Sequence, residues 1–241
     1  MAMKGKFKMT SDKSNAQYPE TGSKDYRAFV GAFNFYDIVG ADQFNLLTIK
    51  GLRENHKLLD IGCGSLRGGK LFIPYLKSGQ YCGVEPEEWL VKQGIEENLG
   101  GELIKLKAPR FDYNGNFDFH MFDETFDYLI ACSIFSHASQ KQIVKCLSSA
   151  KEVMHNESMF FASFKEGDNN YSEDKWAYPD VITYQYNWIE QSARQIGLQC
   201  TKIDWTSPHL QTWVVFVRSY FDKNMLEKLK TINTFHHYRR K

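Results

Sequence analysis

One stretch of sequence decides the fold of this 241-residue chain: His56-Lys57-Leu58-Leu59-Asp60-Ile61-Gly62-Cys63-Gly64-Ser65-Leu66-Arg67-Gly68-Gly69. Leu58, Leu59 and Ile61 favour a buried strand, whereas Gly62 and Gly64 permit a tight turn in which a ligand can approach bare backbone. Apolar residues then recur at helical spacing as far as residue 76. The stretch therefore predicts a strand, a glycine-rich turn and a helix whose first amides favour negative charge.

The spacing of the glycines separates two kinds of nucleotide-binding turn. A dinucleotide-binding turn, G-x-G-x-x-G, that began at Gly62 would have a third glycine where this chain has Arg67. The next predicted strand, residues 81–84, is followed by Glu85, about 20 residues beyond the turn, where a carboxylate can accept hydrogen bonds from a ribose. A cofactor with a ribose is therefore expected, and a nicotinamide dinucleotide is disfavoured.

The sequence Asp60-Ile61-Gly62-Cys63-Gly64, followed by Glu85, resembles the first two motifs of the class I S-adenosylmethionine-dependent methyltransferases. The resemblance covers residues 35–218 and implies an α/β fold with a doubly wound, Rossmann-like, seven-stranded sheet whose last strand is antiparallel. It also implies that S-adenosylmethionine is the cofactor, with Asp60 near its methionine part and Glu85 on its ribose hydroxyls. The cofactor-binding residues expected at the turn are Asp60, Gly62, Cys63, Gly64, Arg67 and Glu85.

Composition and charge are those of an ordinary globular protein. Apolar residues make up 42% of the chain and its net charge is +1, so nothing favours nucleic acid or a membrane surface as a partner. The chain has neither an apolar run long enough for a membrane helix nor the pattern of a secretory signal. Five scattered cysteines predict free thiols rather than disulfides or a metal site. We therefore expect a cytoplasmic monomer or homodimer that acts on a small molecule without a metal.

The pattern divides the chain into three parts. Residues 1–24 are polar without a sustained period and are expected to be flexible. Residues 25–218 are expected to form the methyltransferase domain, with an N-terminal helical cap and a substrate-specific insertion at about 165–187. Residues 219–241 are expected to form a short helix and a basic end.

Further elements are expected at regular intervals along the domain. Strands are predicted within 102–107 and at 126–133, 158–164, 198–204 and 211–217, and helices at 87–99, 140–154 and 187–197. Turn residues interrupt the segment 110–119, where the family places an acidic residue and an apolar neighbour against the adenine. Asp118 and Phe119 are the expected pair, with a surface turn as the alternative.

The helical cap carries two candidate substrate-binding residues. An aromatic segment from Tyr26 leads into a predicted helix that ends near Gly51. In methyltransferases similar to this chain, such a segment covers the cofactor and part of the substrate pocket. Tyr36 and Gln43 are therefore expected to contact the substrate, with packing on the sheet as the alternative role.

Residues after the predicted strand 126–133 should face the chemistry, because ligands in open α/β sheets bind at the carboxyl ends of strands. Ser133 is expected beside the methyl group of the cofactor. Methyl transfer is an in-line displacement that depends on alignment, and a hydroxyl acceptor must also lose a proton, for which neutral histidine is suited. His137 is the expected base, with helix capping as the alternative. His209, in a predicted loop, is the second candidate base, with a solvated loop histidine as the alternative.

The insertion mixes aromatic and polar side chains, which suits a sugar or another small polar ring compound. Trp176, Tyr178 and Tyr184 are the expected substrate-binding residues. The predicted reaction is O-methylation of a small polar molecule, with a saccharide or a nucleotide-activated sugar precursor of a surface polysaccharide as the most specific hypothesis. The alternatives are methylation of another small or phosphorylated metabolite, an NAD-dependent oxidoreductase, and a cofactor-binding partner subunit without catalysis.

Overall fold

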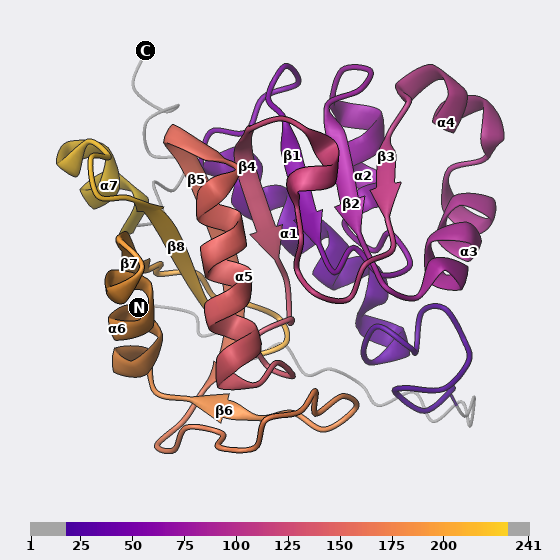
Figure 1. Ribbon diagram of the computed structural model, residues 1–241. Helices are drawn as coiled ribbons and strands as arrows, with labels where there is room; N and C mark the ends of the chain where they lie inside the picture. The colour runs from indigo at the N-terminus through magenta and orange to yellow at the C-terminus, as the bar shows by residue number, and fades with distance from the viewer. Residues whose placement is uncertain (1–17, 231–241) are drawn as a thin grey trace, which may run out of the picture.

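The apolar stretch before the glycine turn forms the central strand of the molecule, β1 (Leu58–Ile61), and all of its residues are buried. The computed structural model describes residues 18–230 (Figure 1). Its other elements are, in chain order, η1 (Phe33–Phe35), α1 (Tyr36–Ile49), α2 (Gly69–Tyr75), β2 (Tyr81–Val84), α3 (Glu88–Asn98), α4 (Gly101–Lys107), β3 (Arg110–Asp112), η2 (His120–Phe122), β4 (Phe126–Ala131), α5 (Gln140–Glu152), β5 (Met154–Glu166), β6 (Thr183–Tyr184), α6 (Tyr186–Gln195), β7 (Leu198–Lys202), β8 (Thr212–Arg218) and α7 (Lys223–Lys230).

The sheet has the strand order β3-β2-β1-β4-β5-β8-β7, with the short β6 paired to β5 outside this order. β1, β2, β3, β4 and β5 are mutually parallel, and β8 runs antiparallel to both β5 and β7. This arrangement confirms the doubly wound Rossmann-like sheet with an antiparallel last strand. The order of the strands reverses between β1 and β4, so a crevice is expected at their carboxyl ends.

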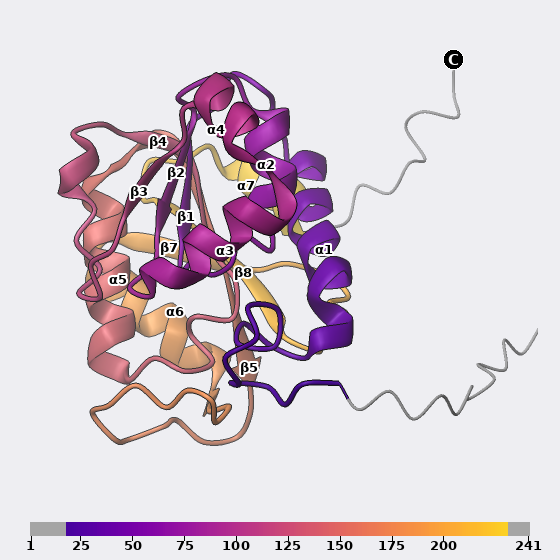
Figure 2. The same ribbon diagram turned by 90° about the vertical axis from the view of Figure 1, so that its right-hand side faces the viewer.

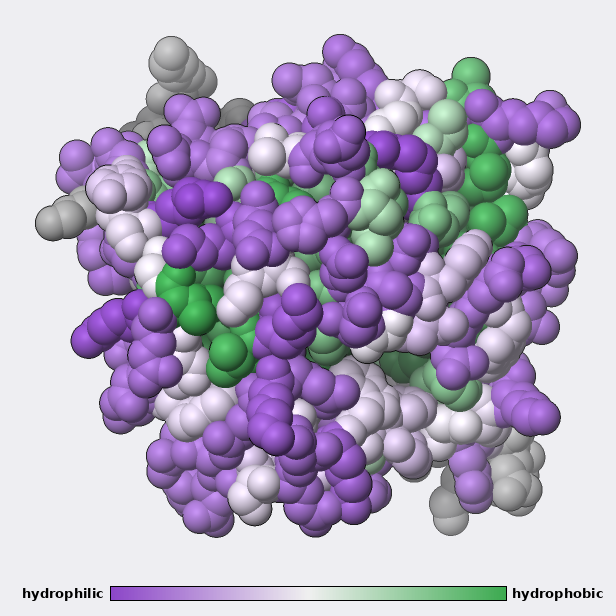
Figure 3. All heavy atoms as spheres, in the orientation of Figure 1, coloured by the Kyte–Doolittle hydropathy of each residue, from purple (hydrophilic) through white to green (hydrophobic). Residues whose placement is uncertain are grey.

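Helices cover both faces of the sheet, with α1 and α2 on one side and α5 and α6 on the other (Figure 2). Alternate residues of β1 enter two separate cores, Leu58 on one face and Leu59 on the other. Because both faces are covered, the central strands are nearly continuous apolar runs. Most of the surface in Figure 3 is hydrophilic. Within residues 18–230, no helix is long and apolar enough to cross a membrane.

One predicted segment differs from the structure. The strand expected within residues 102–107 is wrong, because this segment forms α4, and the strand lies at β3 instead. Short apolar runs do not distinguish a strand from a helix, and here Glu102 and Lys105 form an i,i+3 ion pair that supports the helix. The expected flexible segment lies mostly outside the described residues, and the basic end of the tail lies wholly outside them.

Two helices approach the glycine turn closely because each has a glycine at the contact. A Cβ atom at Gly40 in α1 would overlap the backbone oxygen of Arg67, and one at Gly94 in α3 would overlap the backbone oxygen of Ser65. Glycine is unfavourable within a helix, so its presence here reflects close packing rather than helix propensity. The turn is therefore clamped between α1 and α3.

We expect Gly40→Ala and Gly94→Ala each to lower the free energy of unfolding by about 1–3 kcal/mol, although alanine favours helices, because the added methyl group overpacks the turn. Gly101→Ala is the matched control: Gly101 is the first residue of α4, and a Cβ there meets no atom within 4 Å. That control should not be destabilised. Urea denaturation of the three variants provides the measurement, and equal stability of all three would contradict the clamp.

Candidate active site

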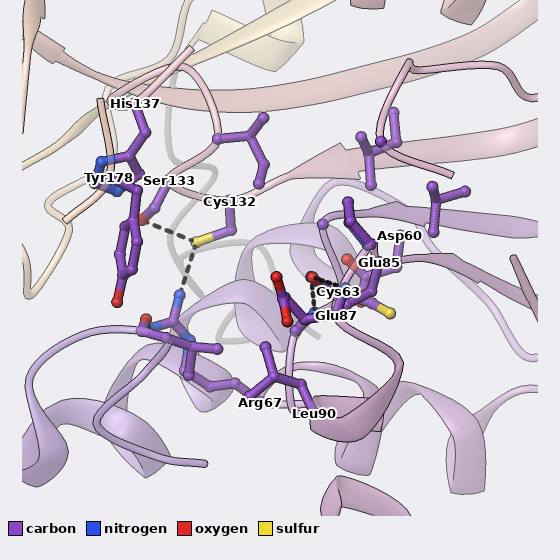
Figure 4. Close-up of a pocket in the computed structure, with 18 of the residues that line it drawn as sticks. Asp60, Cys63, Arg67, Glu85, Glu87, Leu90, Cys132, Ser133, His137 and Tyr178 are labelled. Atoms are coloured by element: carbon purple, nitrogen blue, oxygen red, sulfur yellow. Dashed lines mark hydrogen bonds between the residues drawn. The ribbon is translucent and has the colours of Figure 1, made fainter. Parts of the chain in front are cut away.

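A cavity of about 500 Å³ lies at the carboxyl ends of β1 and β4, where the strand order reverses. Its wall comes from the glycine turn, the end of β2, residues 114–117, the loop after β4, the segment before α1 and the insertion after β5. Ten of the lining residues are labelled in Figure 4. The volume falls within the range of small-molecule and cofactor sites.

The floor of the cavity is backbone that only glycine accommodates. Gly62 has a φ of 69° and Gly64 a φ of 56°, in the left-handed region that other residues rarely adopt. A Cβ at Gly62 would overlap the Ile134 side chain, and one at Gly64 would lie 2.7 Å from Val30 Cγ1. The amide of Gly62 donates to the carbonyl of Val84 over 2.8 Å, which anchors the turn to β2.

Glu85 follows β2 and directs a buried carboxylate at the glycine turn. Its Oε2 accepts a hydrogen bond from the Gly64 amide, and its Oε1 accepts one from the Glu87 amide, both over 3.0 Å. Burial raises the pKa of Glu85 to about 7, although the two backbone hydrogen bonds oppose this change. A carboxylate retains free lone pairs after two such bonds, so Glu85 can also accept hydrogen bonds from a diol.

Asp60, at the end of β1, is a second buried acid on the wall. Its Oδ2 accepts a hydrogen bond from the Tyr81 hydroxyl over 2.7 Å. Burial raises the pKa of Asp60 to about 6, against the lowering effects of the Tyr81 hydrogen bond and of the positive charge of Arg67. Figure 4 shows Asp60, Glu85 and Glu87 towards the same end of the cavity. This end favours ligand groups that donate hydrogen bonds or carry positive charge.

The loop after β4 is held by a small polar network. Ser133 has a φ of 65°, a strained value for a residue other than glycine. Its amide donates to Ser163 Oγ over 2.8 Å, and its Oγ accepts from Gln211 Nε2 over 3.1 Å. Gln211 also donates to Ser136 Oγ and accepts a hydrogen bond from Ser163 Oγ. Gln211 therefore ties the start of β8 to this loop, a role for which the sequence pattern carries no signal.

His137 lines the cavity from the same loop. Its Nδ1 lies 2.8 Å from the backbone oxygen of Asp180, so Nδ1 carries the proton and Nε2 has the free lone pair. Burial lowers the pKa of His137, and the hydrogen bond to Asp180 partly opposes this. The imidazole is therefore neutral at pH 7. Its ring centroid lies 5.0 Å from that of Tyr178 and 5.8 Å from that of Trp176.

Two segments far apart in sequence meet over the cavity. The ring of Phe29 packs on Trp89 of α3 and on Tyr178 of the insertion, with centroid distances of 5.2 and 5.5 Å. The Tyr178 hydroxyl also donates to the backbone oxygen of Phe29. These contacts join the segment before α1 to the insertion and form an aromatic roof at the wall of the cavity.

The structure brings most of the predicted residues to the cavity. The predicted residues on its wall are Asp60, Gly62, Cys63, Gly64, Arg67, Glu85, Ser133, His137, Gln43, Trp176 and Tyr178. Tyr36 and Tyr184 are not on the wall. The hydroxyl of Tyr36 donates to the backbone oxygen of Ser65 over 2.7 Å, and that of Tyr184 donates to the backbone oxygen of Ala138 over 2.8 Å. Both are fully buried packing residues.

The adenine pair is also placed differently. Phe119 is fully buried in the core beneath the sheet, and Asp118 accepts a hydrogen bond from the His120 amide in a local turn. In this segment, the residues that line the cavity are Asn114, Gly115 and Phe117 instead. Phe117 has a φ of 56°, and this left-handed residue changes the direction of the chain, which alternation in the sequence did not reveal.

His209 lies off the wall and belongs to a structural chain of hydrogen bonds. Its Nδ1 lies 2.9 Å from Ser207 Oγ, and Ser207 Oγ donates to Asp42 Oδ2 over 3.5 Å. Burial lowers the pKa of His209 to about 4, and the charge of Arg67 acts in the same direction. The structure thus favours His137 over His209 as the group that faces a ligand.

Several residues on the wall were missed by the sequence analysis. They are Phe29, Val30, Leu90 and Gln142. Ile134, which follows β4 and was expected to face the chemistry, also lines the cavity. Phe29 lies in the aromatic segment that was expected to cover the pocket, so its residue type was a usable signal. The others become visible only when the elements that carry them pack together.

No protein-family model and no curated protein matches this sequence. Solved structures do match the fold. A TehB-like S-adenosylmethionine-dependent methyltransferase of Corynebacterium glutamicum has a TM-score of 0.55 at 14% identity, over 76% of this chain and 89% of that one. Magnesium protoporphyrin IX methyltransferase of Synechocystis PCC 6803, with bound S-adenosylhomocysteine, has a TM-score of 0.56 at 14% identity, over 78% and 88% of the chains.

The glycopeptide N-methyltransferase MtfA, also with bound S-adenosylhomocysteine, has a TM-score of 0.56 at 10% identity, over 76% of this chain and 90% of that one. The chain therefore has the fold of the class I S-adenosylmethionine-dependent methyltransferases, as its motifs predicted. The similar proteins are named for different acceptors, so the likeness defines the fold and not the substrate.

The raised pKa of Glu85 makes stability depend on pH. The folded protein holds this proton more tightly than the unfolded chain, so the stabilisation is complete below about pH 4.5 and is lost as pH rises through about 7. We expect the free energy of unfolding to fall by about 3 kcal/mol from this group over that range. Glu85→Gln should reduce the slope in urea denaturation at pH 5 to 8, and the remaining slope reflects the raised pKa of Asp60. Glu88→Gln, an exposed change in α3, should keep the wild-type slope.

Proposed function

We propose that this protein is an S-adenosylmethionine-dependent methyltransferase that methylates a hydroxyl group of a small polar molecule. One observation carries the proposal: the buried carboxylate of Glu85 is fixed by two backbone amides directly beside a left-handed glycine turn. Both features lie in one cavity at the strand reversal of this fold. Similar folds have been solved with S-adenosylmethionine or S-adenosylhomocysteine bound.

The cavity offers a site for each part of the cofactor. Glu85 would accept hydrogen bonds from the two ribose hydroxyls, while Asn114 and Phe117 would take the place expected of Asp118 and Phe119 at the adenine. The turn of Gly62, Cys63 and Gly64 would pass under the cofactor, with Asp60 and Arg67 near its methionine part and Ser133 near its methyl group. The cofactor supplies an electrophilic methyl group on a sulfonium, and the protein residues align the acceptor with it.

His137 is the proposed general base. Because Asp180 fixes the proton on Nδ1, the lone pair of Nε2 is free to take a proton from an acceptor hydroxyl. The lowered pKa keeps this nitrogen unprotonated at neutral pH. The roof of Phe29 and Tyr178 would exclude water that could compete with the acceptor. This chemistry needs only a base and alignment, so we propose a metal-independent reaction.

The acceptor is proposed to be a saccharide or a nucleotide-activated sugar precursor of a surface polysaccharide. Trp176 and Tyr178 line the cavity beside His137, and aromatic faces next to hydrogen-bonding groups suit sugar rings. Gln43 is buried on the wall and offers a further amide. Another small or phosphorylated metabolite is the second candidate, favoured by the positive charge of Arg67 on the same wall.

Two other functions are less well supported. An NAD-dependent oxidoreductase is expected to have a dinucleotide-binding turn with three glycines. In this chain Arg67 stands at the position of the third glycine. A cofactor-binding partner without catalysis would not require His137 to have its Nε2 lone pair free.

We further infer that the protein is cytoplasmic and acts as a monomer or homodimer on a small molecule and not on nucleic acid. Its domain would extend over residues 25–218, with an insertion at 165–187 and a tail at 219–241. All five cysteines are free thiols, which fits a reducing compartment.

Isothermal titration calorimetry tests the cofactor. We expect the wild-type protein to bind S-adenosylhomocysteine and not NAD⁺. Glu85→Gln should weaken the binding by about 10- to 100-fold, because a charged acceptor of the ribose hydroxyls is lost. Glu88→Gln should bind as the wild type does. Binding of NAD⁺ in place of S-adenosylhomocysteine would contradict the proposed function.

Transfer of a labelled methyl group from S-adenosylmethionine to saccharides and nucleotide sugars tests the base. His137→Gln should lower the rate by about 100-fold or more while the affinity for S-adenosylhomocysteine stays unchanged. The wild-type rate should fall at acidic pH as the imidazole is protonated, and the residual rate of the variant should lack this limb. His155→Gln is the matched control, because His155 contacts Asp127 away from the cavity. A variant as fast as the wild type would remove His137 as the base.

A further inference from the structure

The start of α5 carries one hydrogen-bonding group that the protein itself does not use. The Oγ of Ser139 donates to Asp174 Oδ1 over 3.4 Å, and Gln140 Nε2 donates to a backbone oxygen of the insertion over 2.8 Å. Lys141 forms an ion pair with Asp174. Of these side chains and that of Gln142, only the Gln142 Nε2 has no partner in the described part of the chain. Gln142 is also the one among the four residues that lines the cavity.

The helix cap fixes the orientation of the Gln142 side-chain amide. Its Oε1 accepts a hydrogen bond from the backbone N–H of Ser139 over 2.8 Å, and the backbone N–H of Gln142 donates to Ser139 Oγ over 3.4 Å. A backbone N–H can only donate, so the side-chain atom that meets it is the oxygen. The nitrogen therefore occupies the other branch of the amide, and its two N–H donors are placed before any ligand binds.

This amide lies next to the proposed base. Ser139 comes two residues after His137, and consecutive Cα atoms are about 3.8 Å apart, so a group bonded to the Ser139 backbone is a close neighbour of His137. Both Gln142 and His137 line the cavity. Figure 4 shows His137 beside Tyr178, and Glu85 towards the other end of the cavity. The Gln142 amide therefore belongs to the end expected for the methyl acceptor and not to the end of the proposed ribose site.

The two side chains have complementary hydrogen-bonding roles. His137 offers a lone pair on Nε2, because its Nδ1 donates to the backbone oxygen of Asp180. Gln142 offers only donors, because its oxygen is used by the helix cap. A ligand with hydroxyl groups on two neighbouring carbons satisfies both: one hydroxyl donates to His137, and the oxygen of the other accepts from Gln142. A ligand without the second hydroxyl would cover the Gln142 donors and leave them unpaired, which is unfavourable.

We propose that Gln142 determines the specificity for the acceptor: it selects a vicinal diol, in which the hydroxyl group that becomes methylated has a second hydroxyl group on the neighbouring carbon. The inference rests on the proposed function and narrows it, because it names the feature of a saccharide that the site reads. The Gln142 amide positions the acceptor by hydrogen bonding and takes no part in bond making.

Two variants separate the N–H donors of Gln142 from its capping role. Gln142→Glu keeps an oxygen for the cap, since glutamate also serves at this position of a capping box, but it removes both donors. Gln142→Met removes the donors and the cap without adding a charge. Gln191→Glu, an exposed change in α6, is the control for an added negative charge. We expect the Tm to fall only in Gln142→Met, and the affinity for S-adenosylhomocysteine to stay unchanged in all three variants.

Methyl transfer is measured on the methyl glycosides and uridine diphosphate derivatives of glucose and galactose. The acceptor that the wild type methylates fastest is compared with analogues in which each hydroxyl group next to the methylated one is replaced in turn by hydrogen. We expect one analogue to lower the kcat/KM of the wild type by about 10- to 100-fold. Gln142→Glu and Gln142→Met should show this loss on the intact acceptor and no further loss on that analogue, because the donors that read the second hydroxyl are already absent. Gln191→Glu should behave as the wild type does.

The inference and the proposed function can be told apart by their failures. If Gln142→Glu or Gln142→Met methylates the intact acceptor as fast as the wild type, the inference is overturned and the proposed function stands. The same holds if the affinity of Gln142→Glu for S-adenosylhomocysteine falls as much as its rate, because the amide would then contact the cofactor. A wild-type protein that does not bind S-adenosylhomocysteine, or that methylates none of these saccharides, contradicts the proposed function and the inference with it.

Discussion

The close approach of several segments to one glycine turn is the constraint on which the structure depends. Gly40 and Gly94 let two helices press against its carbonyl oxygens, and Gly62 and Gly64 leave room for Ile134 and Val30 above it. Every one of these contacts fails if a single methyl group is added without movement. The turn is therefore rigid, and the ligand site that it forms is shaped before binding.

This rigidity explains why buried charges can persist in the cavity. Glu85 keeps its place because two backbone amides hold its oxygens, although burial raises its pKa to about 7. Asp60 is held by the hydroxyl of Tyr81, and Arg67 by a carbonyl and a thiol. Polar groups fixed in this way need little reorganisation when a ligand arrives, which is the condition for tight recognition of charge.

The loop after β4 is held in place by a residue next to the last strand of the sheet. Gln211 precedes β8, far from Ser133 in sequence, yet its amide holds both Ser133 and Ser136. The antiparallel β8 lies against β5, and that pairing carries Gln211 to the carboxyl ends of the parallel strands. The strained backbone of Ser133 is thus supported by the residue that precedes the last strand of the sheet.

Much of the candidate site could be predicted because local sequence carries it. The strand, turn and helix after residue 56 and the acid at Glu85 follow from residue types at fixed spacing, and the doubly wound class of the domain follows from the alternation of strands and helices. His137 could be predicted for the same reason, because it lies in the loop that follows a recognisable strand. The segment 102–107 was not, because a short apolar run fits either a strand or a helix.

The sequence by itself determined most of the strands, the glycine turn and the carboxylate beside it, because each depends on residue types within a few positions of one another. Only the tertiary structure decided which aromatic and polar side chains reach the cavity. Tyr36 and Tyr184 turn into the core and Tyr178 reaches the wall, although all three were equally plausible by residue type. The physical reason is that such placement depends on how segments as distant as Phe29 and Tyr178 pack together, and on left-handed backbone at Phe117 that no periodicity records.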